Sequence, residues 1–167
     1  MFLYEKFDHS FHFPQKEQKP FLFLLVFAFV RSSKQLLAHD LDKERGIPID
    51  DYKFIKFHMS NHISKLAQHI KIRQRVIATA VTYMRRVYTR KSLSEYEPRL
   101  VAPTCLYLAC KAEESVVHAK LLVFYMKKLY ADEKFRYEIK DILEMEMKVL
   151  EALNFYLVVF HPYRSLH

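Results

Sequence analysis

Glycine is almost absent from this chain of 167 residues, in which Gly46 is the single example. Glycine accounts for about 7% of an average protein. The tight turns of sheet proteins and the loops that cradle phosphates both depend on its freedom at positive φ. The sequence therefore excludes glycine-rich nucleotide-binding motifs. It predicts helices joined by short polar turns.

Cysteine is also scarce, with Cys105 and Cys110 the two in the chain. Their spacing fits neither a zinc knuckle nor a disulfide framework. Both fall in an apolar run, where thiols are inert. We expect a reduced, intracellular protein without thiol chemistry.

Histidines and hydroxyls form no recognisable catalytic arrangement. His58 and His62 lie four residues apart on a predicted helix, a spacing that can chelate a metal. The intervening residues lack the glutamate of a zinc protease, and no third ligand has a suitable spacing. We interpret the two rings as a half-buried structural pair. The sequence predicts no metal, no cofactor and no enzymatic activity.

Acidic residues are outnumbered, and the net charge is +8. This charge predicts attraction to nucleic acid, to an anionic membrane or to an acidic protein surface, without choosing among them. A basic region is formed by Arg73, Arg75, Arg85, Arg86, Arg90 and Lys91. These side chains could bind phosphates, but a solvated face is the commoner explanation.

Long apolar runs are confined to Phe21–Val30 near the start and to the region around residue 105. The first run is about half of what spans a bilayer and is similar to the apolar part of a signal peptide. The segment before it is too long and too polar for the start of a signal peptide. We expect residues 1–40 to form a poorly ordered or loosely packed extension with no role at a membrane. A secreted or membrane-anchored protein is an alternative interpretation, and this run is its only support.

Helical periodicity runs through the rest of the chain and predicts an all-α fold. The expected helices cover residues 50–69, 72–89, 98–114, 118–130 and 136–153. The apolar positions of the first are Tyr52, Ile55, Met59, Ile63, Leu66 and Ile70. Those of the second are Val76, Ile77, Ala80, Val81, Met84, Val87 and Tyr88. Those of the last are Ile139, Ile142, Leu143, Val149, Leu150 and Leu153.

The third helix is apolar on every side. Between Leu100 and Cys110 the one polar side chain is Thr104, and the chain then changes abruptly to Lys111, Glu113 and Glu114. A helix without a polar face must be surrounded by other helices, which places it at the centre of the bundle. Pro103 is compatible with this helix, because a proline near the first turn removes little hydrogen bonding.

Glu146 is a second anomaly, because it lies about 20° from Ile139 within the apolar stripe of the last helix. A buried carboxylate costs several kcal/mol unless it is paired or a partner covers it. Lys111 is its natural companion. The two form an internal salt bridge, the commoner outcome for buried charges, or they flank a surface where another protein docks.

Three long runs of the sequence resemble the C-type cyclins, and in particular their plant members. They are "LDKERGIPIDDYKFIKFHMSNHISKLAQHIKIRQRV", "RQRVIATAVTYMRRVYTRKSLSEYEPRLVAPTCLYLACKAEES" and "DILEMEMKVLEALNFYLVVFHPYRSL". The resemblance covers residues 41–166. It implies a cyclin box of five helices around a central third helix.

The resemblance also implies a function. C-type cyclins are noncatalytic regulatory subunits of a cyclin-dependent kinase in the Mediator kinase module, in the nucleus. Their hallmark lysine and glutamate, which grip the backbone around the C-helix of the kinase, fall on Lys111 and Glu146. Leu106, Cys110, Glu114 and Phe124 would lie near or under that surface. Neither a small-molecule substrate nor direct nucleic-acid binding is implied.

Departures from the family concern the ends of the chain and the first helix. We expect residues 41–154 to form the first cyclin box, residues 155–167 to begin the linker to a second box, and that second box to be missing. Residues 1–40 do not resemble the N-terminal helix of the family. Where cell-cycle cyclins carry the substrate-docking sequence MRAIL, this chain has "IKFHM", so we expect no such substrate recruitment. The alternative function is a basic helical nucleic-acid-binding module, which shares the fold.

Overall fold

The computed structural model describes residue 42, residues 46–130 and residues 136–161. Five helices form within these residues, and no strand does. They are α3 (Ile49–Ile70), α4 (Gln74–Val87), α5 (Pro98–Ala112), α6 (Ala119–Tyr130) and α7 (Ile139–Ala152). The predicted all-α fold is confirmed, and each predicted helix boundary lies within three residues of the observed one.

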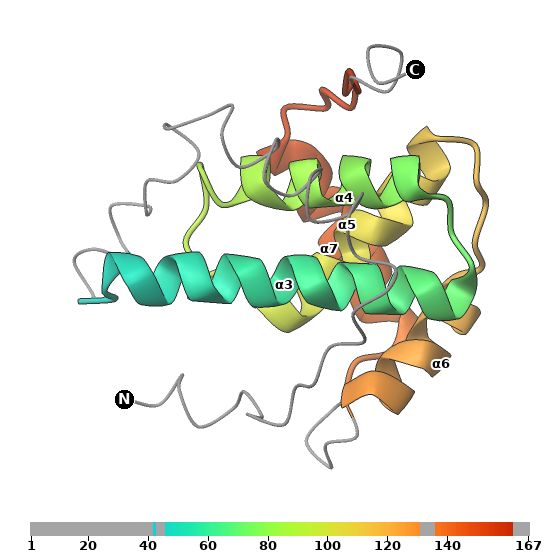
Figure 1. The fold of residues 1–167 in the computed structure, drawn as a ribbon, viewed down its shortest axis with the longest axis horizontal. Helices are drawn as coiled ribbons and strands as arrows, with labels where there is room; N and C mark the ends of the chain where they lie inside the picture. The colour runs from blue at the N-terminus through green and yellow to red at the C-terminus, as the bar shows by residue number, and fades with distance from the viewer. Residues whose placement is uncertain (1–41, 43–45, 131–135, 162–167) are drawn as a thin grey trace, which may run out of the picture. The chain divides into compact units, whose positions relative to one another are not determined.

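Helix α5 is the centre of the bundle, as predicted. Every residue from Leu100 to Cys110 is buried, and α5 contacts each of the other four helices. Figure 1 shows α5 behind α3 and α4, with α7 beside it. Thr104, the polar residue of this stretch, donates its hydroxyl to the Leu100 carbonyl on its own helix. The central helix therefore needs no polar partner from its neighbours at this position.

Pro103 lies beyond the first turn of α5, so our explanation for its tolerance was wrong. A proline at this position cannot donate to the carbonyl four residues earlier, that of Arg99. The hydroxyl of Tyr130, at the end of α6, donates to this carbonyl at 3.0 Å. The hydrogen bond that the helix loses is thus replaced by one from a neighbouring helix.

The buried face of α7 differs from the predicted stripe. Ile142 and Val149 are buried as expected, whereas Ile139 and Leu143 are exposed. The buried face is formed instead by Ile142, Met145, Glu146, Val149 and Ala152. Ile139 is the first residue of α7 and lies at the edge of the core. Ile139, Leu143 and Met147 repeat every fourth residue and form an exposed apolar row on one side of the helix.

The chain leaves α7 through two consecutive residues at positive φ, Asn154 (52°) and Phe155 (55°). Residues 155–161, which we call the strap, then run without helical structure along α4. The Tyr83 hydroxyl donates to the Leu157 carbonyl at 2.6 Å, and Arg86 donates to the Val158 carbonyl at 3.3 Å. The polar side of α4, which we predicted to be solvated, is therefore partly used to bind the end of the chain.

Residues 1–40, including Phe21–Val30, lie outside the described part of the chain, as do residues 162–167. Among the residues that the structure describes, no helix combines the length and the apolar character needed to cross a membrane.

Candidate functional site

Lys111 and Glu146 are in direct contact. Lys111 lies in the last turn of α5, and its Nζ donates to both carboxylate oxygens of Glu146 at 2.8 Å. Glu146 comes from the middle of α7, which packs against α5. The predicted pairing of these two residues is confirmed. Its function as a docking handle stays a prediction.

The two members of the pair differ in their access to solvent. The Lys111 side chain is 46% exposed, whereas that of Glu146 is 9% exposed. The ammonium group also lies 4.4 Å from the centre of the Tyr107 ring, one turn earlier on α5. The buried carboxylate thus holds the lysine in place, and the ammonium group is accessible to solvent on its outer side. The internal pairing is thus observed, and the outward lysine is compatible with the docking reading, which stays a prediction.

Electrostatics keeps Lys111 charged. Burial by itself would lower the pKa of Lys111, but the hydrogen bond to Glu146 and the charge of Glu146 outweigh it and raise that pKa above its ordinary value. An ammonium group has three N–H donors, of which two are directed at the Glu146 carboxylate. The lysine is therefore suited to bind a carbonyl of another chain without abandoning Glu146.

Exposed apolar side chains lie on α6 and α7, both of which contact α5. On α7 the row of Ile139, Leu143 and Met147 runs beside Glu146, with Leu143 about 60° from it around the helix. On α6, which contacts both α5 and α7, Leu121 and Phe124 are exposed, and Phe124 is 60% exposed. We call Lys111, Leu121, Phe124, Leu143 and Met147 the docking surface. A charged centre with apolar neighbours is typical of a protein–protein interface.

The remaining predicted site residues differ in their exposure to solvent. Leu106 and Cys110 are buried in α5, so their side chains cannot contact a partner directly. Burial raises the pKa of the Cys110 thiol to about 12, which leaves it protonated and unreactive at neutral pH. Glu114 is exposed and follows the end of α5. Its assignment to kinase binding stays a prediction.

Glu114 adopts a left-handed backbone conformation with φ of 53°. Residues other than glycine pay about 1 kcal/mol or more in this region. We expect Glu114→Gly to raise the free energy of unfolding by about 0.5–1 kcal/mol, measured by urea denaturation. Ala112→Gly, two residues earlier within α5, is the control and should lower it by a similar amount. A loss of stability in Glu114→Gly would contradict the presence of strain.

Tyr107 was missed by the sequence analysis, although a signal was present. It precedes Lys111 by four residues, which places the two side chains on the same face of a helix. Its tyrosine ring was read as one more apolar member of the central run. The contact between ring and ammonium could have been predicted from this spacing.

The histidines of α3 contact aromatic rings. His58 lies 4.6 Å from Phe54 and His62 lies 4.3 Å from Tyr130 between ring centres. Burial, followed by the charge of Lys65, lowers the pKa of His62 to about 4. Both residues are half-buried, as predicted for a structural pair. No group of three or more metal-binding side chains gathers within the described residues.

Helices packed around a buried central helix, with a lysine at its end paired to a glutamate of the last helix, agree with the cyclin box that the resemblance implies. The chain belongs to the cyclin family: the family described as "Cyclin, N-terminal domain" matches residues 50–158.

Among its relatives are the C-type cyclins. The chain is 88% identical to Cyclin-C1-2 of Arabidopsis thaliana over 130 residues, which cover 78% of the chain and 51% of that relative. It is 67% identical to Cyclin-C1-1 of Oryza sativa over 141 residues (80% and 55%). It is 40% identical to Cyclin-C of Rattus norvegicus over 147 residues (80% and 53%). The predicted resemblance is confirmed, and the chain spans about half the length of these curated relatives.

A solved structure shares the fold. It is described as "Structure of the CAK complex form Chaetomium thermophilum bound to ATP-gamma-S". The TM-score is 0.58 at 20% sequence identity, and the match covers 87% of this chain and 41% of that one. At this identity the likeness establishes the cyclin fold alone.

Proposed function

We propose that this chain is a noncatalytic regulatory subunit that binds a cyclin-dependent serine/threonine kinase through the docking surface and promotes its active conformation. The observation that carries the proposal is the Lys111–Glu146 pair, with its outward lysine and buried carboxylate. Membership of the cyclin family supports it. From the resemblance to C-type cyclins we further propose the kinase of the Mediator kinase module as the partner and the nucleus as the location.

The geometry suits recognition of a kinase C-helix. The end of a helix or its adjoining loop exposes backbone carbonyls that lack intrahelical donors, and the Lys111 ammonium can donate to them. The apolar side chains of α6 and α7 would cover the apolar face of the same helix. Charged and apolar contacts together fix both the register and the orientation of the partner.

Binding of this kind would activate the kinase by a shift of population. An active kinase pairs a strand lysine with a glutamate of the C-helix, which must be held inward. A subunit that binds only the inward arrangement stabilises it by its differential affinity. A shift from 1:99 to 99:1 requires about 5.5 kcal/mol, which is within the range of protein interfaces.

Phe124 provides a test of the surface. We expect Phe124→Asp to lower kinase affinity about 10- to 100-fold, because it places a charge in an apolar contact. The free energy of unfolding should change by about 0.5 kcal/mol or less, because Phe124 is 60% exposed. Titration of the purified chain with the Mediator-associated kinase measures the first quantity and urea denaturation the second.

The matched control is Phe57→Asp on α3, where the phenylalanine is 46% exposed. It carries the same change of charge on a helix that contributes no residue to the docking surface. We expect it to bind the kinase like the wild type. Equal losses in both variants would indicate a general effect of charge, and unchanged binding in Phe124→Asp would place the interface elsewhere.

The nucleic-acid alternative gains little support from the basic residues of α4. Arg75 pairs with Glu113 at 2.8 Å, Arg86 donates to Val158, and Arg90 donates to the Ala152 carbonyl at 2.9 Å. Three of the arginines that were candidates for phosphate contacts are thus bound to their own chain. DNA binding in the submicromolar range that falls steeply with salt would reinstate this alternative.

A further inference from the structure

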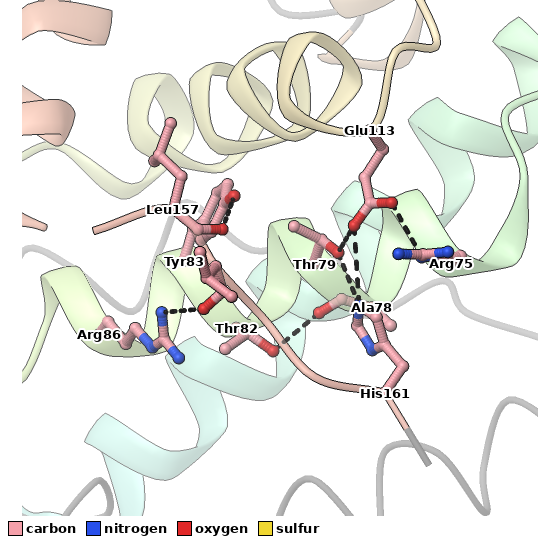
Figure 2. A network of polar contacts seen from close by, with 10 residues as sticks. Arg75, Ala78, Thr79, Thr82, Tyr83, Arg86, Glu113, Leu157 and His161 are labelled. Carbon is pink, nitrogen blue, oxygen red and sulfur yellow. Dashed lines mark hydrogen bonds and ion pairs between the residues drawn. The ribbon is translucent and has the colours of Figure 1, made fainter. Parts of the chain in front are cut away.

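Glu113 is the centre of a polar network at the end of α5, opposite to the docking pair. One carboxylate oxygen accepts from the Thr79 hydroxyl at 2.9 Å, and the other lies 2.8 Å from Arg75 Nε. Figure 2 shows Arg75 and Thr79 on α4, Glu113 above them, and the strap running from Leu157 to His161 below them. The Glu113 side chain is 15% exposed. It therefore faces its own domain and not a partner.

The strap joins this network through His161. Its Nε2 lies 2.7 Å from the Thr79 hydroxyl oxygen and 3.9 Å from the Glu113 carboxylate. The single hydroxyl proton of Thr79 is directed at Glu113, so the Nε2–H of His161 donates to Thr79. Burial lowers the pKa of His161, and Arg75 lowers it further, against the opposing effect of Glu113. The imidazole is therefore neutral at pH 7, in agreement with this arrangement of protons.

Lys111 and Glu113 are tied in opposite directions. Two residues along a helix correspond to a rotation of about 200°, so their side chains leave the last turn of α5 on opposite sides. Lys111 is held by α7 and Glu113 by α4 and the strap. The next residue, Glu114, is strained at φ of 53°, and the Ser115 amide closes the turn by donating to the Cys110 carbonyl at 2.8 Å. A strained turn of this kind persists only when the contacts around it hold it.

We propose that Glu113 is a positioning residue for the docking surface: its ties to Thr79, Arg75 and the strap hold the last turn of α5 so that Lys111 meets Glu146 and the kinase in one orientation. This inference rests on the proposed function. It adds a role for the strap, which contributes no residue to the docking surface. Thr79 and His161 influence kinase binding through Glu113, without touching the kinase.

Thr79→Val tests the proposal, because it removes the hydroxyl that joins Glu113 to His161 and nearly preserves the shape of the side chain. We expect kinase affinity to fall about 5- to 10-fold in the wild-type background and less than about 2-fold in a Glu146→Gln background. The loss of affinity should be smaller in the Glu146→Gln background, because Lys111 is already no longer held in position by the Glu146 carboxylate. Glu113→Gln should behave in the same way, since it removes the charge that Arg75 pairs with. An equal loss in both backgrounds would overturn the proposal.

Hydrogen exchange of the full chain gives a readout that needs no kinase. We expect Thr79→Val to accelerate exchange of the Glu113, Glu114 and Ser115 amides at least about tenfold, through local opening of this turn. Thr82→Val is the matched control on the same helix, because the Thr82 hydroxyl donates to the Ala78 carbonyl of its own helix. Unchanged exchange at residues 113–115 would overturn the proposal. If the wild-type chain bound no kinase, the proposed function would fail, and the exchange result would still decide whether Glu113 holds the turn.

Discussion

Replacing Lys111 with alanine is expected to lower kinase affinity about 30- to 1,000-fold, which corresponds to about 2–4 kcal/mol of binding free energy. Central charged residues with fixed geometry are often the energetic hot spots of interfaces. The Lys111 ammonium has two short hydrogen bonds to Glu146 and a tyrosine ring beside it. It therefore approaches a partner already oriented, with little entropy left to lose. Titration calorimetry with the purified kinase measures the change.

The same substitution affects the fold, and a control is needed to separate the two effects. Lys111→Ala leaves the largely buried Glu146 carboxylate without its partner, at a cost of about 1–2 kcal/mol of unfolding free energy, since the lysine itself is half exposed. A double variant, Lys111→Met with Glu146→Leu, removes both charges. Apolar replacement of a buried ion pair is often neutral or stabilising. We expect this variant to be as stable as the wild type in urea and still to bind the kinase poorly.

The double variant distinguishes the two readings of the pair that the sequence left open. Normal kinase binding by a stable Lys111→Met/Glu146→Leu chain would mean that the salt bridge only closes the bundle. Lost binding at unchanged stability would assign the pair to docking. The exposed position of Lys111 above a buried Glu146 favours the second outcome.

The central helix could be predicted from the sequence because its pattern admits one arrangement. A run from Leu100 to Cys110 that is apolar on all sides must be surrounded, and the observed burial agrees. The charged residues that follow then have to lie at its end, where α7 brings Glu146 to Lys111. Periodicity and the cost of a buried carboxylate were sufficient to predict this pair.

The exposed row of α7 could not be predicted in the same way. Ile139 and Leu143 were assigned to the core because they are apolar, yet the packing of α7 against α5 buries the side that carries Met145 and Glu146. Periodicity gives the relative angles of residues on a helix, but not which of two adjoining apolar sides faces the neighbour. Of these two exposed residues, Leu143 belongs to the proposed docking surface.

The strap and its contacts were also beyond the sequence analysis. Thr79 is not among the predicted apolar positions of its helix, but it is buried and contacts Glu113 and His161. These three residues are separated by long stretches of chain, and no local pattern links them. His161 reaches the other two because the chain turns back at Asn154 and Phe155, both at positive φ, a conformation that asparagine tolerates but that phenylalanine gives no reason to expect.

Leu106→Ala is expected to have the largest effect on stability, a loss of about 2–5 kcal/mol of unfolding free energy. Leu106 is fully buried in the middle of α5, so its removal leaves a cavity that the surrounding helices cannot fill. Leu121→Ala on α6 makes the same chemical change at a side chain that is 42% exposed, and it should cost less than about 1 kcal/mol. Urea denaturation of both variants measures this difference.

Kinase binding by the same two variants should reverse the order. At a temperature where Leu106→Ala is folded, we expect its affinity to lie within about twofold of the wild type, because Leu106 is fully buried and cannot contact the kinase. Leu121→Ala should bind more weakly, since it removes an apolar contact from the docking surface itself. If a folded Leu106→Ala chain lost its affinity, kinase binding would depend on the packing of α5 itself. Buried residues of α5 could then not be distinguished from the residues that contact the kinase.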